Sequence, residues 1–322
     1  MTATPKPKLA HLGLFTRDMA PMLDFYTGPM GLTITDEGTY GDPPARIVFM
    51  SNDPFEHHQF VLAGGRSAEK DSTVGETGFK APDLAALRGL KTLLEAEPDA
   101  SDITTVDHGI CWTLYFRDPE GIRCSVSVDT THHVPQPTAW PLDLSLSDAD
   151  IIGNTARRAR EIPGSMPRED WQGARTAQFS AEGRLTMEGE ETGNANPDFP
   201  RPHPERVLLP VHPLAARPPA IAQAHCGFKV SDMEAMITFY DKVLGYAVTD
   251  RGTMPAIGAE PEREYTYLSR DPNEHHQVIL VSGRDMDAPS SVNQLSLRIM
   301  TLDELRRMEA ELEAHPAVGP LR

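Results

Sequence analysis

The feature that most constrains the fold is an internal duplication. The stretch "HLGLFTRDMAPMLDFYTGPMGLTITDEGT" from His11 aligns with "HCGFKVSDMEAMITFYDKVLGYAVTDRGT" from His225, at an offset of 214 positions. Past Thr253 the second copy gains four residues, and an offset of 218 then holds through "NDPFEHHQFVL" and "RDPNEHHQVIL". Agreement over roughly eighty positions predicts a chain built from a repeated structural unit.

Each copy begins with a predicted βαβββ unit. The short apolar stretch at His11 favours a strand, and Asp18 is suited to cap a helix whose apolar residues recur at helical spacing. Gly31 marks the end of this helix. Three further strands are expected at "LTITDEG", "ARIVFMS" and "HHQFVLAGG", separated by Gly and Pro turns.

A second unit follows in the first copy. Its strand runs to about Ala81, Asp83 caps a leucine-rich helix, and "ITTVDHG", "CWTLYFRDPEG" and "RCSVSVDT" supply three strands. Residues 8–130 therefore hold two βαβββ units, which can pair so that their sheets curve around a shared cavity. The predicted fold class is α+β, with tandem paired βαβββ modules forming curved-sheet barrels.

The second copy is incomplete in the sequence. Arg322 corresponds to Thr104, so the last three strands of the first copy have no counterpart. Truncation or degeneration, completion by a partner chain, and substitution by the segment Thr176–Gly189 are the competing explanations. The expected domains are a first barrel at 1–150, a helical tail and proline-rich connector at 151–220, and a second, truncated module at 221–322.

Composition limits the classes of partner. A formal net charge of -17 argues against nucleic acid and anionic membranes, which are bound by clustered Lys and Arg, and no basic patch is visible along the sequence. No apolar run approaches the ~20 residues of a membrane span, and the N-terminus lacks a signal core. Cys111, Cys124 and Cys226 have no paired spacing, which is typical of reduced thiols in a cytoplasmic protein.

The sequence resembles the vicinal oxygen chelate superfamily, which contains glyoxalase I, bleomycin-resistance proteins and extradiol ring-cleaving dioxygenases. The matching features are His11 and His225 on first strands, both "EHHQ" phrases, "VNQLSLRIMTLDEL" and "HGICWTLYFRDPEGIR". The last phrase looks most like the extradiol branch. Because this fold hosts several chemistries, function has to be argued from the site.

The resemblance implies a divalent metal held inside a barrel, usually by two His and one Glu in the dioxygenases. Such a set leaves positions open for a catecholate and for O2 on Fe(II). His11 corresponds to the first ligand, and Glu76 stands in place of the second histidine. The carboxylate position falls on Ser125, a poor ligand, and Gln59 is the candidate third ligand.

In the second copy, His225 corresponds to the first ligand and is the fourth candidate metal residue. Gln277 repeats Gln59, and Gln294 occupies the place of the second histidine. Fe(II) is expected ahead of Mn(II), Ni(II) or Zn(II), and a site without metal is the remaining alternative. The resemblance also implies a homodimer.

Two further residues match positions that serve the substrate in extradiol enzymes. His108 and Tyr115 stand where the family keeps a His and a Tyr that hydrogen-bond substrate oxygens, and His can also move a proton near neutral pH. The "EHHQ" histidines are assigned structural or hydrogen-bonding roles, because their two pairs fall in different barrels. If Gln59 points inward, alternation along the strand turns His57 inward and His58 away.

These features predict a metal-dependent extradiol-type dioxygenase that cleaves a catechol-like aromatic ring with O2, as in aromatic compound catabolism. One alternative is a glyoxalase-like lyase or isomerase that uses Ni, Zn or Mg. The other is a metal-free small-molecule binding protein whose metal ligands have degenerated, for which Ser125 and Gln294 are the main indications. The expected partner is a small aromatic or vicinal-oxygen compound.

Overall fold

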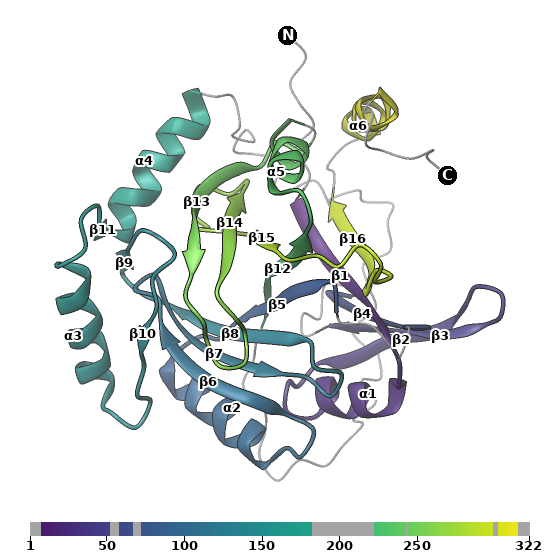
Figure 1. Ribbon diagram of the computed structural model, residues 1–322, viewed down its shortest axis with the longest axis horizontal. Coiled ribbons are helices and arrows are strands. Elements are labelled where there is room, and N and C mark those ends of the chain that lie inside the picture. The colour runs from purple at the N-terminus through teal and green to yellow at the C-terminus, as the bar shows by residue number, and fades with distance from the viewer. Residues whose placement is uncertain are drawn as a thin grey trace, which may run out of the picture.

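The computed structural model describes residues 8–51, 58–66, 72–181, 222–242, 244–298 and 302–314 (Figure 1). The first repeat contains β1 (Lys8–Thr16), α1 (Met19–Thr27), β2 (Thr33–Tyr40), β3 (Ala45–Ser51), β4 (Phe60–Gly64), β5 (Val74–Lys80), α2 (Leu84–Ala96), β6 (Ser101–Asp107), β7 (Cys111–Arg117) and β8 (Arg123–Asp129). The connector contains β9 (His132–His133), β10 (Trp140–Pro141), α3 (Asp148–Ala159), β11 (Met166–Pro167) and α4 (Arg168–Ala181). The second repeat contains β12 (Ala222–Val230), α5 (Met233–Lys242), β13 (Ala247–Met254), β14 (Arg263–Ser269), β15 (Val278–Ser282), β16 (Val292–Arg298) and α6 (Leu302–Ala314).

The predicted helix starts are confirmed by their capping bonds. Asp18 accepts a hydrogen bond from the amide of Ala20 at 3.2 Å, and Asp83 accepts one from Ala86 at 2.8 Å. Both side chains satisfy amides that the first helical turn leaves without a partner. The apolar stripes of α1 and α2 are buried in the main hydrophobic core.

Three complete units share one strand order. In β1–β4, β5–β8 and β12–β15 the first strand pairs in parallel with the fourth, and the remaining neighbours are antiparallel. In Figure 1 these units form curved sheets with helices on their outer sides, and α2 contacts β6 and β8. This α+β architecture of curved βαβββ modules is the one predicted.

The partners of the units differ from the expected ones. Within the described residues, β5 pairs antiparallel with β12 of the second repeat, and β1 pairs antiparallel with β16. One sheet of nine strands therefore runs β10-β6-β7-β8-β5-β12-β15-β14-β13, and one of five runs β16-β1-β4-β3-β2. In the part of the chain that the structure describes, the units β1–β4 and β5–β8 do not close a barrel with each other, because each presents its first strand to the other repeat.

The nine-stranded sheet curls so that β13 and β14 arch over β7 and β8 (Figure 1). Apolar side chains from both repeats meet inside this curl, including Tyr115 from β7, Tyr265 and Tyr267 from β14, and Ile279 from β15. The joint between β5 and β12 thus creates an interior that neither repeat forms alone.

The connector contributes helices at one end of the sheet. Ser147 caps α3, and α4 follows after β11. Thr176–Ala181 belong to α4, so this part of the proposed substitute strand is helical, and the rest of that segment lies outside the described residues, as does the proline-rich stretch. Among the described helices, none is both long and apolar enough to cross a bilayer.

Candidate small-molecule site

A cavity lies inside the curl of the nine-stranded sheet, and its empty space, which includes open solvent, is about 490 Å3. Its walls come from both repeats, which the β5–β12 joint brings together. The first repeat contributes Glu76, His108, Ile110, Cys111, Thr113, Tyr115, Arg123, Ser125 and Ser127, and the connector contributes Gln136. The second repeat contributes His225, Met254, Tyr265, Tyr267, His276 and Ile279.

Glu76 is the polar centre of this cavity. Its Oε1 accepts a hydrogen bond from Ser125 Oγ at 2.5 Å and one from His225 Nε2 at 3.1 Å. Its Oε2 lies 3.4 Å from Nε of Arg123, and both of these side chains are almost fully buried. The carboxylate is therefore surrounded by two hydrogen-bond donors and a guanidinium.

This surrounding keeps Glu76 ionised. Burial alone would raise the pKa of the carboxyl group, but the His225 hydrogen bond, the Arg123 charge and the Ser125 hydroxyl outweigh burial and hold that pKa at about 2. The guanidinium of Arg123 is in turn kept charged, because the carboxylate of Glu76 raises its pKa against the effect of burial. The pair is a buried ion pair across two strands.

Two glycines allow His225 and Glu76 to meet. Gly78 faces His225 in the β5–β12 ladder, and a Cβ there would overlap the imidazole ring. Gly227 faces Glu76, and a Cβ there would lie 2.9 Å from the amide nitrogen of Glu76. Both positions leave space that the neighbouring strand fills.

His108 and Tyr115 form a second polar pair in the cavity. Nδ1 of His108 lies 2.5 Å from the carbonyl of Thr138, and Nε2 lies 2.8 Å from the hydroxyl of Tyr115. Burial lowers the pKa of His108 to about 4, so the ring is neutral near pH 7. Burial also raises the pKa of Tyr115, which keeps its hydroxyl protonated.

The hydrogen-bond direction of this pair follows from the carbonyl. A carbonyl oxygen only accepts, so Nδ1 of the neutral His108 carries the proton and Nε2 must accept from Tyr115. The hydroxyl proton of Tyr115 is thereby occupied, and its oxygen remains available as an acceptor. A ligand at this oxygen would have to donate a hydrogen bond.

Arg123 is a site residue that the sequence prediction missed. Its guanidinium carbon lies 4.0 Å from the centre of the Tyr115 ring, so one cation touches both polar pairs. Arg123 precedes Ser125 by two positions on β8, and strand alternation places both on one face. That spacing was a usable signal, because a buried carboxylate at Glu76 requires a cation.

The remaining predicted metal residues lie in the five-stranded sheet. His11 on β1 contacts Gln294 on β16, with 2.7 Å between the two side-chain nitrogens, and its Nε2 lies 3.3 Å from Nε2 of His58. Gln59 Oε1 accepts a hydrogen bond from Ser51 at 3.4 Å. The structure therefore brings Glu76 to His225 and separates it from His11 and Gln59.

The "EHHQ" phrase faces the cavity differently from the prediction. His276 lines the cavity, whereas Gln277 Oε1 accepts the amide hydrogen of Arg270 at 3.0 Å. In the first copy, His58 packs against His11 with 4.1 Å between the ring centres. The expected alternation was shifted by one residue, and such a shift exchanges the two faces of a strand. His57 lies outside the described residues.

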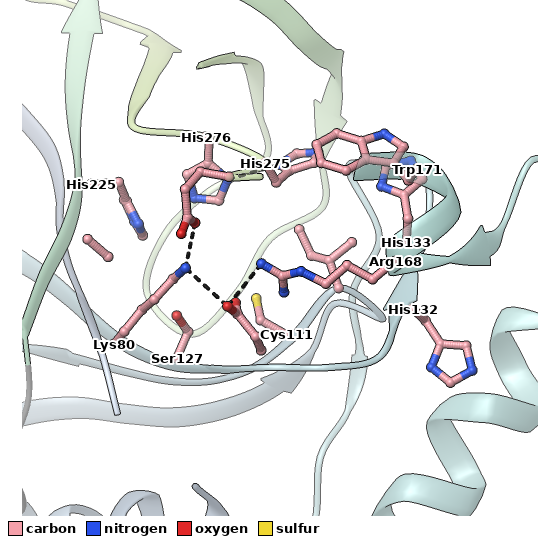
Figure 2. A pocket seen from close by; sticks show the side chains of 14 residues that line it. Lys80, Cys111, Ser127, His132, His133, Arg168, Trp171, His225, His275 and His276 are labelled. Atoms are coloured by element: carbon pink, nitrogen blue, oxygen red, sulfur yellow. Dashed lines mark hydrogen bonds and ion pairs between the residues drawn. The ribbon is translucent and has the colours of Figure 1, made fainter. Parts of the chain in front are cut away.

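The cavity opens toward a cluster of histidine and aromatic rings (Figure 2). Trp171 from α4 stacks on His133 with 4.7 Å between ring centres, and His275 lies beside both. Lys80 and Arg168 both pair with Asp129 at this opening, at 3.1 and 3.0 Å. The opening shares Cys111, Ser127, His225 and His276 with the cavity, so the two spaces adjoin.

Comparison with known proteins gives the family. The model of the Glyoxalase/Bleomycin resistance protein/Dioxygenase superfamily matches residues 8–126 and 222–317, which is more than half of the chain. The chain belongs to this superfamily. This agrees with the resemblance and with the tandem curved modules.

The individual proteins that the chain resembles share at most about a third of the aligned residues with it. Biphenyl-2,3-diol 1,2-dioxygenase 3 of Rhodococcus globerulus is 32% identical over 135 residues, which are 40% of this chain and 66% of that protein. Biphenyl-2,3-diol 1,2-dioxygenase 2 of the same organism is 28% identical over 44% of this chain and 71% of its own length. The solved glyoxalase I of Zea mays aligns over 96% of this chain and 80% of its own, with 11% identity and a TM-score of 0.48.

Membership of the superfamily implies a divalent metal, so we asked whether the residues fit one. No group of three or more His, Cys, Asp or Glu side chains in the described part of the chain is arranged to hold a metal ion. In the cavity, Ser125 stands where a carboxylate is expected, and the charge of Glu76 is already matched by Arg123. The donor set therefore does not fit a His, His and Glu centre.

Proposed function

We propose that the cavity of the nine-stranded sheet binds a small aromatic compound bearing phenolic hydroxyl groups, and that it does so without a metal ion. The observation that carries the proposal is the ion pair between Glu76 and Arg123, at 3.4 Å in the cavity wall. The net charge around a site determines how strongly it attracts a divalent cation. A carboxylate that is neutralised by a fixed guanidinium has little net charge left for this attraction.

The preference for a hydroxyl follows from the His108–Tyr115 pair. Tyr115 donates a hydrogen bond to His108, so its oxygen offers a hydrogen-bond acceptor to the cavity. A phenolic hydroxyl is a donor of suitable polarity for that oxygen. Burial strengthens the preference for a hydroxyl, because leaving a buried polar group without a hydrogen-bond partner costs about 1–3 kcal/mol of free energy.

The preference for an aromatic ring follows from the walls. Tyr265 and Tyr267 stack in the same sheet with 6.1 Å between ring centres, and Met254 and Ile279 also face the cavity. Aromatic and apolar side chains of this kind are typical of the walls of sites for small aromatic ligands. The relatives named biphenyl-2,3-diol dioxygenases support the same class of compound.

Titration of chelator-treated protein tests the proposal. Catechol should bind, and 1,2-dimethoxybenzene, which has no hydroxyl to donate, should bind at least about tenfold more weakly. Tyr115→Phe should reduce the affinity for catechol to that of the dimethoxy compound. Tyr246→Phe is the matched control, because the Tyr246 hydroxyl is buried, lies outside the cavity lining and has no hydrogen-bond partner among the described residues.

Failure of catechol to bind the metal-free protein would overturn the proposal. Unchanged catechol affinity in Tyr115→Phe would overturn the assignment of the acceptor. A lower affinity in Tyr246→Phe as well would show that the loss reflects general damage to the core.

A second candidate is extradiol ring cleavage with O2, which is favoured by the names of the two Rhodococcus globerulus relatives. It needs a divalent metal, with Fe(II) expected first, and His225 and Glu76 are the adjoining ligand-type side chains. Anaerobic loading with Fe(II), followed by metal analysis and exposure to catechol in air, separates the candidates. Stoichiometric iron and a yellow ring-fission product would establish ring cleavage, whereas our proposal predicts neither.

A further inference from the structure

The side chains that line the inside of the nine-stranded sheet change along the length of β8. On β8, Arg123, Ser125, Ser127 and Asp129 alternate and therefore share one face. Asp129 lies at the opening beside Trp171, Ser125 lies in the central cavity, and Arg123 reaches both the cavity and a further pocket at the opposite end. The interior is thus a row of three adjoining spaces.

The pocket at the far end is cationic. It encloses about 760 Å3 of space that includes open solvent, and its lining is mainly polar. Four cationic side chains and one carboxylate line it: Arg117, Arg123, Lys229, Arg263 and Glu260. In a chain with a formal net charge of -17, the fold has gathered these cations from β7, β8, β12 and β14.

The negative charges around this pocket occupy only some of the donors. Glu260 Oε1 accepts a hydrogen bond from Arg117 at 2.6 Å, and its other oxygen lies 3.9 Å from Arg263. Asp102 contacts Arg117 at 3.4 Å. One lining carboxylate is therefore shared by two arginines, and Asp102 serves the arginine that is already paired.

Arg123 and Arg263 keep unused hydrogen-bond donors. Arg123 is 6% exposed, and its Nε has no hydrogen-bond partner among the described residues, although it lies 3.4 Å from Glu76. The Nε of Arg263 likewise has no hydrogen-bond partner within that set. A buried guanidinium with unused N–H groups is costly unless an acceptor meets it.

We propose that this arginine end is an oxyanion-binding subsite, in which Arg123 and Arg263 hold a carboxylate or a phosphate group. Guanidinium groups suit these anions because their N–H groups match two oxygens at once. The anion is either a substituent of the aromatic ligand in the adjoining cavity or a free ion bound beside it. The first form rests on the proposed function, and the second does not.

Calorimetric titration in a phosphate-free buffer tests the subsite with three probes: inorganic phosphate, catechol and 3,4-dihydroxybenzoate. Phosphate should bind the wild-type protein, and Arg263→Gln should weaken that binding at least about tenfold, as expected for loss of a charged hydrogen bond. Arg251→Gln is the matched control, because Arg251 pairs with Glu264 and Glu234 on the surface of the same repeat. Its phosphate affinity should equal that of the wild type.

A variant of opposite sign guards against loss of fold. Glu260→Gln removes the lining carboxylate and should tighten phosphate binding, which general damage would not do. If phosphate does not bind, or if it binds equally to wild type, Arg263→Gln and Glu260→Gln, the subsite is overturned. Melting curves of each variant show whether the protein is folded in the titration.

The probes also separate the two sources of the anion. If 3,4-dihydroxybenzoate binds more tightly than catechol, and phosphate or Arg263→Gln removes this gain, the anion is a substituent of the ligand. If phosphate binds with the stated dependence and the gain is absent, the anion is a free ion. Phosphate binding without catechol binding would overturn the proposed function and leave the subsite standing.

Discussion

His225 and Glu76 are 149 positions apart in the chain, yet Nε2 of the histidine lies 3.1 Å from Oε1 of the carboxylate. The contact crosses the joint between β12 and β5, where the second repeat pairs with the first. The cavity and its polar centre therefore depend on the pairing of β5, the first strand of its unit, with β12 of the second repeat.

The buried ion pair should dominate the stability of this interior. Glu76→Gln leaves Arg123 buried without its counter-charge, and we expect the free energy of unfolding to fall by about 3–5 kcal/mol. Exchanging both residues, Glu76→Leu with Arg123→Met, should recover most of the loss. Denaturant unfolding of both variants measures this coupling.

An exposed pair provides the control for that experiment. Glu37 pairs with Arg46, and their side chains are 57% and 48% exposed. Glu37→Gln should therefore change the unfolding free energy by no more than about 1 kcal/mol. Equal effects of Glu76→Gln and Glu37→Gln would contradict the ion pair.

The strand joint can be tested by crosslinking. Thr77 on β5 is opposite Cys226 on β12, both are buried, and the Thr77 hydroxyl has no hydrogen-bond partner among the described residues. Cys124 on β8 lies beside Thr77 on the other side, so it is first replaced by Ser. In this background Thr77→Cys should form a disulfide with Cys226 on oxidation, because facing residues of antiparallel strands are close enough for one. Mass spectrometry of peptides should find this link within one chain.

Two results would contradict the joint as described. Absence of the Thr77→Cys link to Cys226 would mean that β5 has another neighbour. A link found only between two chains on a non-reducing gel would mean that the joint forms between copies of the protein.

The pH dependence of stability should reveal His108. Its pKa is lowered from 6.5 to about 4, chiefly by burial, so between these values the unfolded chain binds a proton that the folded protein does not. Its contribution is complete above pH 6.5 and is lost as the pH falls toward 4. His108→Gln, which keeps an acceptor for Tyr115, should remove about 2 kcal/mol of the fall between pH 7 and pH 5.

Unfolding by denaturant at these two pH values measures the effect. If His108→Gln retains the full pH dependence of the unfolding free energy, the assignment of His108 as a buried neutral histidine is wrong.

Much of the fold was predictable because its determinants are local. Asp18 and Asp83 cap their helices through amides two and three residues away, so the signals lie within one turn. The proximity of His108 and Tyr115 also has a local cause, because His108 directly follows β6 and Tyr115 lies on β7, the strand that pairs with β6. Alternation on β8 could likewise have revealed Arg123.

The choice of strand partner was not predictable in the same way. β1 and β12 carry the similar sequences "HLGLFT" and "HCGFKV", so both first strands offer β5 a comparable edge. The pairing is decided by contacts between residues more than a hundred positions apart, which no local pattern records. For this reason Glu76 was assigned to His11 and not to His225.

The two first-strand histidines provide the most direct test of the central claim that the ligand cavity lies across the β5–β12 joint. Catechol affinity should be measured in chelator-treated wild type, His225→Ala and His11→Ala. His225 lines the cavity, so His225→Ala should weaken catechol binding at least about tenfold. His11 lies in the other sheet, so His11→Ala should keep the catechol affinity within about twofold of the wild-type value. Loss of binding in His11→Ala with full affinity in His225→Ala would contradict the account.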